Sequence, residues 1–290
     1  MICKTRRNVS CLLTEAVESS TPTLAHVVPS TGRGECVTAV TSLGDHVFIL
    51  RWAIQQVLVY DARTFKLQRR ISIPSLCCLW GLAACAHYKC LYVSDGVCKS
   101  VIHRVELPDD TTLTKWSVAD SPRGLSVNME HNVVVASYEM NKIEEYTTHG
   151  SLVREITLQA GVRSPFHAVQ LSSGHFAVSQ FTSPGAVSVV GADGQAVRCC
   201  RPSQTSAVGK MLYPRSLAVT KNDDILVADR DNDRIISISS SLRSAQVLHL
   251  PVDSGIQVPW GLCLDESRGR VYVGEGGGSF RVLVFDGVRL

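Results

Sequence analysis

The sequence predicts an all-β fold, a six-bladed β-propeller of four-stranded antiparallel blades that is closed by an N-terminal strand. Three observations lead to this prediction. One segment pattern recurs six times, each copy holds several apolar runs of strand length between polar turns, and no long segment shows the apolar spacing of an amphipathic helix. A repeat of about 40–50 residues with four short strands is typical of a propeller. A sandwich or an up-and-down barrel would not repeat at this period.

The first run of each copy ends in alternating apolar residues and is predicted to form the strand nearest the channel. These runs are VTAVTS at 37, LWGLAA at 79, PRGLSV at 122, FHAVQL at 166, PRSLAV at 214 and PWGLCL at 259. Their equivalent apolar positions lie 42 to 48 residues apart, at Val40, Leu82, Leu125, Val169, Leu217 and Leu262. Two further apolar runs follow each first run, and a weaker fourth run, such as KLQRRISI or LVREITL, often completes the unit.

The sixth copy lacks its fourth run, because only DGVRL follows FRVLVF. We expect Leu24 to Val28, in the strand-like segment TPTLAHVVPS, to supply this outer strand and remove the free edge of an open ring. The sequence accordingly predicts an N-terminal tail at 1–22 and a propeller at 23–290. Within the propeller, the closing strand covers about 23–29, and the blades start near 37, 79, 122, 166, 214 and 259.

Composition narrows the classes of partner and compartment. The net charge of +3 is too small to demand an anionic partner, and we expect no double-stranded DNA. No run of 18 apolar residues occurs, so no membrane span is expected. The eleven cysteines include no C-x-x-C pair and no zinc-type spacing, and several lie in predicted strands. Buried free thiols explain this pattern, so we predict a cytoplasmic protein without a bound metal or cofactor.

The fifth copy, YPRSLAVTKNDDILVADRDNDRIISIS, resembles an NHL repeat, and the second, third and sixth copies resemble it less closely. The resemblance implies a propeller similar to the C-terminal NHL domain of TRIM-NHL proteins, which bind single-stranded RNA or proteins on one propeller face. The family also includes lyases and hydrolases with a metal at the channel. The resemblance therefore bears on the fold more than on the function, because propellers carry many unrelated activities.

The charged turn of this fifth copy is predicted to be structural. Asp229 and Asn232 are suited to hydrogen bonds with backbone groups across the turn. Arg234 is suited to an ion pair with a carboxylate of the turn or of a neighbouring blade, and the resemblance implies that this pattern holds blades together. The alternative makes Asp229 and Asp231 metal ligands, which would require further oxygen ligands that the sequence does not indicate.

One face of the predicted propeller collects the loops that precede each first strand and the loops that join second and third strands. We call it the entry face. The residue before the Gly, Ala or Ser of each copy forms a ring at the channel mouth: Thr38, Trp80, Arg123, His167, Arg215 and Trp260. The loops between second and third strands add Arg51, Trp52, Tyr138, Phe181 and Arg230. All of these except Thr38 are the predicted ligand-binding residues.

Arginines interleaved with aromatic residues suit two kinds of partner. Bases of single-stranded RNA stack on aromatic rings while phosphates meet guanidinium groups, and protein hot spots are also rich in Trp, Tyr and Arg. The residues therefore predict either RNA or a protein partner, with Arg123 and Arg215 contacting phosphate or carboxylate. In the alternative reading, Trp80 and Trp260 simply pack between blades.

The sequence favours a binding platform without catalytic residues over an enzyme. The enzyme alternative is a metal-dependent propeller of the lyase or lactonase type. His167 is the only histidine of the predicted ring, whereas a catalytic zinc usually has three protein ligands. No G-x-S-x-G pattern occurs. The stretch GEGGGSF at 274–280 joins two strands and opens no helix, so we expect a flexible turn there and not a phosphate loop.

Overall fold

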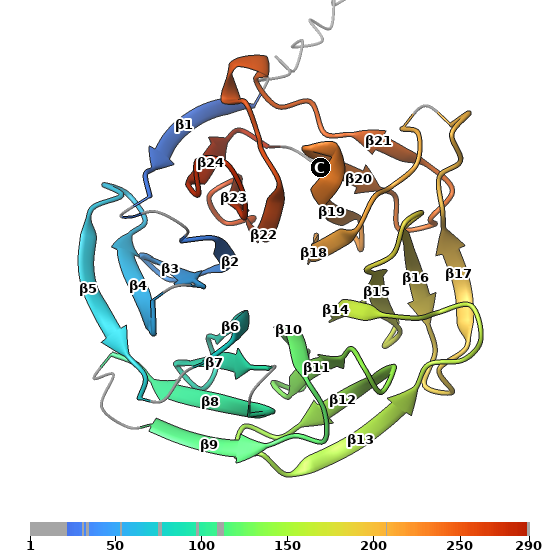
Figure 1. Cartoon of the computed structure of the whole chain (residues 1–290), viewed down its shortest axis with the longest axis horizontal. Helices are drawn as coiled ribbons and strands as arrows, with labels where there is room; N and C mark the ends of the chain where they lie inside the picture. The colour runs from blue at the N-terminus through green and yellow to red at the C-terminus, as the bar shows by residue number, and fades with distance from the viewer. Residues whose placement is uncertain are drawn as a thin grey trace, which may run out of the picture.

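The computed structural model describes residues 22–30, 32, 35–52, 54–74, 77–96, 99–108, 113–206 and 208–288. These residues form six four-stranded antiparallel sheets arranged as blades around a central channel (Figure 1). The predicted all-β, six-bladed propeller is thereby confirmed. Helical structure in the described residues is limited to two 3-10 turns, η1 (Arg230–Asn232) and η2 (Val252–Ser254). None of their helices is long and apolar enough to cross a membrane.

The first five blades each consist of four consecutive strands, ordered from the channel outward. Blade 1 contains β2 (Val37–Leu43), β3 (His46–Arg51), β4 (Gln56–Asp61) and β5 (Leu67–Ser72), and blade 2 contains β6 (Leu79–Cys85), β7 (Cys90–Asp95), β8 (Val101–Glu106) and β9 (Leu113–Ser117). Blade 3 contains β10 (Pro122–Val127), β11 (Val133–Ser137), β12 (Lys142–Tyr146) and β13 (Leu152–Thr157). Blade 4 contains β14 (Pro165–Gln170), β15 (Phe176–Gln180), β16 (Ala186–Val190) and β17 (Ala196–Cys200), and blade 5 contains β18 (Pro214–Val219), β19 (Ile225–Asp229), β20 (Arg234–Ile238) and β21 (Ala245–Val247).

The sixth blade joins two distant parts of the chain. Its strands are β22 (Pro259–Asp265), β23 (Arg270–Glu275), β24 (Val282–Asp286) and, outermost, β1 (Thr23–Val28). Strand β1 pairs antiparallel with β24, and Val28 lies opposite Val282. The predicted closure by an N-terminal strand is confirmed, and the outer edge of β24 is covered as the edge argument requires. Of the predicted tail, residues 1–21 lie outside the described residues.

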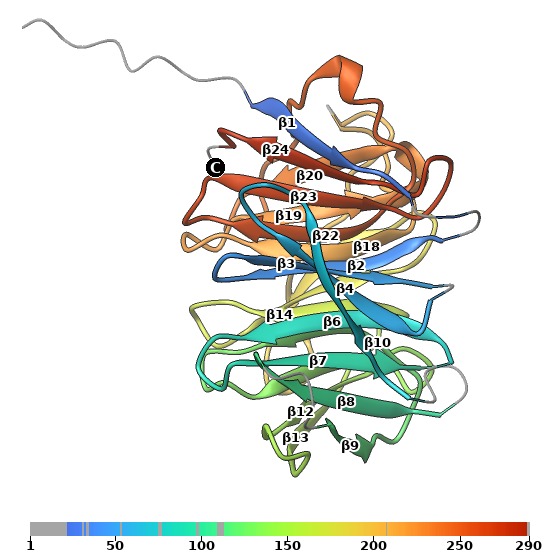
Figure 2. The same ribbon diagram turned by 90° about the vertical axis from the view of Figure 1, so that its left-hand side faces the viewer.

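The blades pack against one another through apolar side chains of their middle strands. Phe48 of blade 1 and Leu82 of blade 2 belong to one buried cluster, and Val134 of blade 3 and Phe176 of blade 4 belong to another. Viewed from the side, the inner strands run along the axis of the ring, so each has one end at either face (Figure 2). Residues at equivalent positions of different blades therefore meet at the same end of the channel.

Close approach of the inner strands explains the Gly of the repeat's Pro-x-Gly-Leu pattern. A Cβ atom added to Gly81 would lie 2.4 Å from the carbonyl oxygen of Arg123 in the next blade. At Gly124 the corresponding contact, to the carbonyl oxygen of Phe166, would be 2.7 Å. Only a residue without a side chain allows the neighbouring backbones to pack this tightly.

A buried residue at the end of the second strand holds the loop that enters the same blade. In three blades this residue is acidic, and its carboxylate accepts a hydrogen bond from a backbone N–H of the loop. The bonds are from Cys78 to Asp95 at 2.8 Å, from Leu212 to Asp229 at 2.7 Å, and from Gln257 to Glu275 at 2.9 Å. Since buried polar groups need hydrogen-bond partners, these carboxylates fix the loops of the entry face.

The charged turn of blade 5 is an extension of this arrangement. The carboxylate of Asp229 also accepts hydrogen bonds from Asn232 Nδ2 and Arg234 Nε, both at 2.8 Å. Asn232 and Arg234 in turn donate to the carbonyl oxygen of Lys210, at 2.8 and 3.2 Å. Asp231, by contrast, is exposed. The predicted structural role of Asp229, Asn232 and Arg234 is confirmed by these contacts.

Candidate functional site

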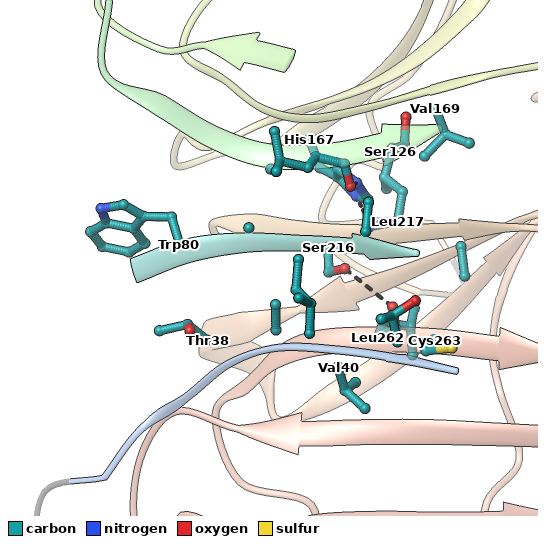
Figure 3. A pocket seen from close by; sticks show the side chains of 18 of the residues that line it. Thr38, Val40, Trp80, Ser126, His167, Val169, Ser216, Leu217, Leu262 and Cys263 are labelled. Carbon is teal, nitrogen blue, oxygen red and sulfur yellow. Dashed lines mark hydrogen bonds between the residues drawn. The ribbon is translucent and has the colours of Figure 1, made fainter. Parts of the chain in front are cut away.

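The channel has a volume of about 300 Å³ and a wall of mixed apolar and polar residues. The repeated apolar residues of the inner strands line it: Val40, Leu82, Leu125, Val169, Leu217 and Leu262. Figure 3 shows Trp80 and Thr38 at one end of this space, with Val40 and Val169 farther along it. Trp80 and Thr38 therefore mark the entry end of the channel.

A group of aromatic and arginine side chains lies across this end, and we call it the entry cluster. Its members are Trp52, Trp80, Arg123, Tyr138, Phe166, Phe181, Arg215, Arg230 and Trp260. The rings of Trp80 and Trp260 are stacked, with centroids 6.2 Å apart. These residues come from blades 2 and 6, which are not neighbours, so their contact spans the mouth of the channel.

Arg215 is the most deeply placed cation of the entry cluster, with 5% of its surface exposed. It is the second residue of β18, so its side chain starts where the inner strand meets the entry face. Four rings surround its guanidinium carbon: Trp260 at 3.7 Å, Phe166 at 4.6 Å, Phe181 at 5.0 Å and Trp80 at 5.4 Å from the ring centroids. Cation–π attraction therefore holds this guanidinium in place.

Hydrogen bonding to Arg215 is incomplete. Its Nε and Nη1 atoms are buried and have no acceptor in the described part of the chain. Burial lowers the pKa of Arg215 well below its ordinary value, and the positive charges of Arg230 and Arg123 lower it further, while Asp231 opposes them. Arg215 is thus a buried guanidinium group enclosed by aromatic rings, and no carboxylate of the described residues lies within ion-pair distance of it.

Two more guanidinium groups complete the cationic part of the entry cluster. The guanidinium carbon of Arg123 lies 4.4 Å from the centroid of the Trp80 ring and 5.1 Å from that of Tyr138. Arg230 lies 5.7 Å from the Trp260 ring and forms an ion pair with Asp231 at 3.2 Å. Both are partly exposed, so they are accessible from the solvent side of the face.

His167 does not take part in this cluster as a ligand-binding group, contrary to the expectation from the sequence. Its Nε2 atom lies 2.9 Å from the carbonyl oxygen of Leu125, and its Nδ1 atom accepts a hydrogen bond from the backbone N–H of Leu217 at 2.9 Å. Burial lowers its pKa. A neutral ring that donates to blade 3 and accepts from blade 5 uses both nitrogens. Its role is to join three inner strands.

Arg51 is also removed from the ligand-binding surface. Its side chain is fully buried, and its guanidinium donates to the carbonyl oxygens of Phe280 at 2.7 Å, Pro29 at 3.1 Å and Glu35 at 3.2 Å. These carbonyls belong to the segments that meet where the ring closes. The expectation that Arg51 contacts a ligand is therefore corrected, because the side chain is buried and backbone carbonyls accept hydrogen bonds from both of its terminal nitrogens, Nη1 and Nη2.

The remaining eight predicted residues do come together in the entry cluster. Phe166 completes the cluster although it was not among the predicted site residues. It directly precedes His167 in β14, so its place beside the ring position was the available signal. Among the described residues, no group of three or more His, Cys, Asp or Glu side chains is arranged to hold a metal ion.

Comparison with family models places one segment of the chain. Residues 211–236 match the model of the NHL repeat. The fifth blade contains an NHL repeat. This match spans β18, β19 and the charged turn described above, and together with the six blades it supports an NHL-repeat β-propeller. A comparison with curated proteins finds no match.

Solved structures share the fold of this propeller at low sequence identity. Hydrazine synthase of Kuenenia stuttgartiensis is similar with a TM-score of 0.65 and 15% identity, over 89% of this chain and 97% of that chain. A catalytically inactive variant of virginiamycin B lyase from Staphylococcus aureus, with quinupristin, gives 0.65 and 11%, over 89% and 82%. The WD40 β-propeller domain of Doa1 gives 0.63 and 14%, over 91% and 96%. Enzymes and a WD40 domain alike share the fold, so the likeness concerns architecture alone.

Proposed function

We propose that this NHL-repeat propeller is a non-catalytic binding platform that recognises a macromolecular partner on its entry face. The sequence leaves single-stranded RNA and a protein segment as candidates, and the geometry favours the protein. The observation that carries the proposal is the entry cluster, where three arginines and six aromatic rings gather at the channel mouth. Trp, Tyr and Arg are the residues that most often supply binding energy in protein interfaces.

The stacking arrangement argues against RNA as the partner. A base needs a free aromatic face, but the face of Trp260 already meets the guanidinium of Arg215 at 3.7 Å. Trp80 contacts Arg123, Arg215 and three other rings. The inner rings of the cluster are therefore used in packing against arginine and against one another.

The rim of the entry face carries a second argument. Acidic side chains lie among the arginines there: Asp120 and Glu139 are near Arg123, and Asp231 pairs with Arg230. A polyanion passing over this rim would meet repulsion, whereas a folded or extended protein segment can match mixed charges. Trp52 and Met140 are exposed by 37% and 47% on the same face, and they supply apolar contact area.

The proposal is tested with tagged chain incubated in a cell lysate, with and without ribonuclease. We expect a partner protein to be recovered in both conditions, and we expect the double variant Trp52→Ala, Arg123→Gln to lose it. Leu152→Ser, on the exposed outer strand β13, is the matched control and should retain it. Recovery that disappears after ribonuclease would indicate RNA instead, which a salt-dependent affinity for single-stranded RNA pools would establish.

Two further features of the proposal have their own tests. A tightly bound zinc or calcium ion, one per purified chain, would replace the platform with the metal-dependent enzyme alternative. We also propose a cytoplasmic, reducing location, supported by buried thiols such as Cys85, Cys90 and Cys263. Thiol labelling of the denatured protein taken directly from cells should then find these cysteines reduced.

A further inference from the structure

Three guanidinium groups of the entry cluster lie close to one another. Arg123 and Arg215 both approach the ring of Trp80, with guanidinium carbons 4.4 and 5.4 Å from its centroid. Arg215 and Arg230 both approach the ring of Trp260, at 3.7 and 5.7 Å. Since each pair shares one ring, three positive charges are concentrated at the channel mouth.

Negative charge within the structure only partly balances these cations. Arg230 has an ion pair with Asp231 at 3.2 Å, but neither Arg123 nor Arg215 has a carboxylate within ion-pair distance in the described ranges. Burial is the main cause of the lowered pKa of Arg215. The positive charges of Arg230 and Arg123 repel its own charge and lower this pKa further. Like charges without an intervening anion raise the free energy of the unliganded face.

The same place holds buried hydrogen-bond donors that have no acceptor in the described part of the chain. They are Arg123 Nε, Arg215 Nε and Nη1, Arg230 Nε, Trp80 Nε1 and Trp260 Nε1. Every one is a donor, and each buried donor without an acceptor costs about 1–3 kcal/mol. Nη2 of Arg215 is not among these enclosed atoms, which leaves it as the nitrogen that a ligand can reach. A group that satisfies such donors must be an acceptor, and the unbalanced positive charge favours an acceptor that is negatively charged.

We propose that the entry cluster contains a binding site for one small oxyanion, a carboxylate or a phosphate group, between Arg123 and Arg215. Guanidinium groups bind both oxyanions through paired N–H···O contacts. The inference deepens the platform proposed above and rests on it, since the anion would be the anchor of the partner. The exposed side chains of Trp52 and Met140 favour an anion attached to an otherwise apolar group, because they offer apolar contact beside the arginines.

Intrinsic fluorescence reports on this site directly. Three of the four tryptophans, Trp52, Trp80 and Trp260, belong to the entry cluster. The fourth, Trp116, lies in β9 beside Tyr92. Titration with potassium phosphate, and separately with sodium acetate, at constant ionic strength should therefore change the emission, and Trp116→Phe should leave that change intact.

Variants separate a built site from general salt effects. We expect saturation with at least one of the two anions, and we expect Arg215→Met and Arg123→Gln each to weaken binding at least tenfold. Arg163→Gln, an exposed arginine outside the cluster, is the matched control and should bind as wild type does. Circular dichroism verifies folding, and Arg123→Gln keeps the test valid if Arg215→Met fails to fold.

Each outcome assigns or overturns the site. Saturation with phosphate alone or with acetate alone identifies the source of the oxyanion. No saturable change with either anion, or an equal change in Arg123→Gln, would overturn the site. If the chain captures a partner but binds neither anion, the proposed partner binding holds and the anion site is wrong. If the chain binds an anion but captures no partner, the anion site holds and the proposed partner binding is wrong.

Discussion

The carboxylate of Asp229 should be worth far more to stability than that of its neighbour Asp231. Asp229 is fully buried and accepts three hydrogen bonds, from Leu212 N at 2.7 Å and from Asn232 Nδ2 and Arg234 Nε at 2.8 Å. Removing one partner of a buried ion pair costs about 3–5 kcal/mol. Since the side chain of Arg234 is 22% exposed and can regain some hydration, Asp229→Ala should lower the free energy of unfolding by about 3 kcal/mol, near the lower end of that range.

Asp231→Ala is the matched control for this prediction. Its carboxylate pairs with Arg230 at 3.2 Å on the surface, where ion pairs contribute about 0–1 kcal/mol. Urea unfolding followed by fluorescence, with equal slopes for the two variants, measures both values. A loss below about 1 kcal/mol for Asp229→Ala would refute the structural role. Calcium that stabilises the wild type, but neither variant, would instead make both carboxylates metal ligands.

Three further predictions concern closure, pH and the buried arginine. Deleting residues 1–28 removes β1, which pairs with β24, and should cause aggregation because the edge of β24 becomes exposed. Light scattering should detect this aggregation, whereas a chain that lacks only residues 1–21 should stay monomeric. Equal behaviour of the two deletions would contradict closure by β1. Burial lowers the pKa of folded His167 below the unfolded value, so its contribution to stability is complete above about pH 6.5 and is lost as the pH falls towards the folded pKa. His167→Gln should accordingly flatten the decline in melting temperature from pH 7 to 5, and an unchanged slope would contradict this. Arg215→Met should keep the free energy of unfolding within about 1 kcal/mol of wild type or raise it. The variant loses the cation–π contacts, but it also removes two buried N–H donors that have no acceptor among the described residues. A decrease above about 3 kcal/mol in urea unfolding would show that the guanidinium is structural.

The fold could be predicted from the sequence because the same sequence pattern recurs in each blade of a propeller. Apolar alternation marks each strand, and a period too long for a hairpin and too regular for a sandwich marks each blade. The first strands begin at Val37, Leu79, Pro122, Pro165, Pro214 and Pro259, each within one residue of the predicted starts. The closing strand followed from a physical requirement, since a blade with three strands leaves an unpaired edge.

The site could be predicted only in part, because equivalent positions of a repeat need not do equivalent work. Arg215 and His167 occupy the same position in adjacent blades, yet His167 bonds two neighbouring backbones and Arg215 is surrounded by rings. Which of these occurs depends on partners that lie about a blade away along the chain, such as Leu217 for His167. The local sequence shows which residue type stands at the position, but it does not show how close the side chain lies to those partners.

The charge at the end of the second strand shows how ring closure decides which arginines remain for a ligand. Blades 2, 5 and 6 have an acid there, because the entering loop offers backbone N–H groups. Blade 1 has Arg51, because the closing junction offers the carbonyl oxygens of Pro29, Glu35 and Phe280. An acid therefore stands where the backbone presents N–H donors, and an arginine stands where the backbone presents carbonyl acceptors. Arg51 is used in closing the ring, whereas in the described part of the chain no acceptor meets Nε of Arg123 or Nε and Nη1 of Arg215. These two arginines are therefore the ones that we propose for contact with a partner.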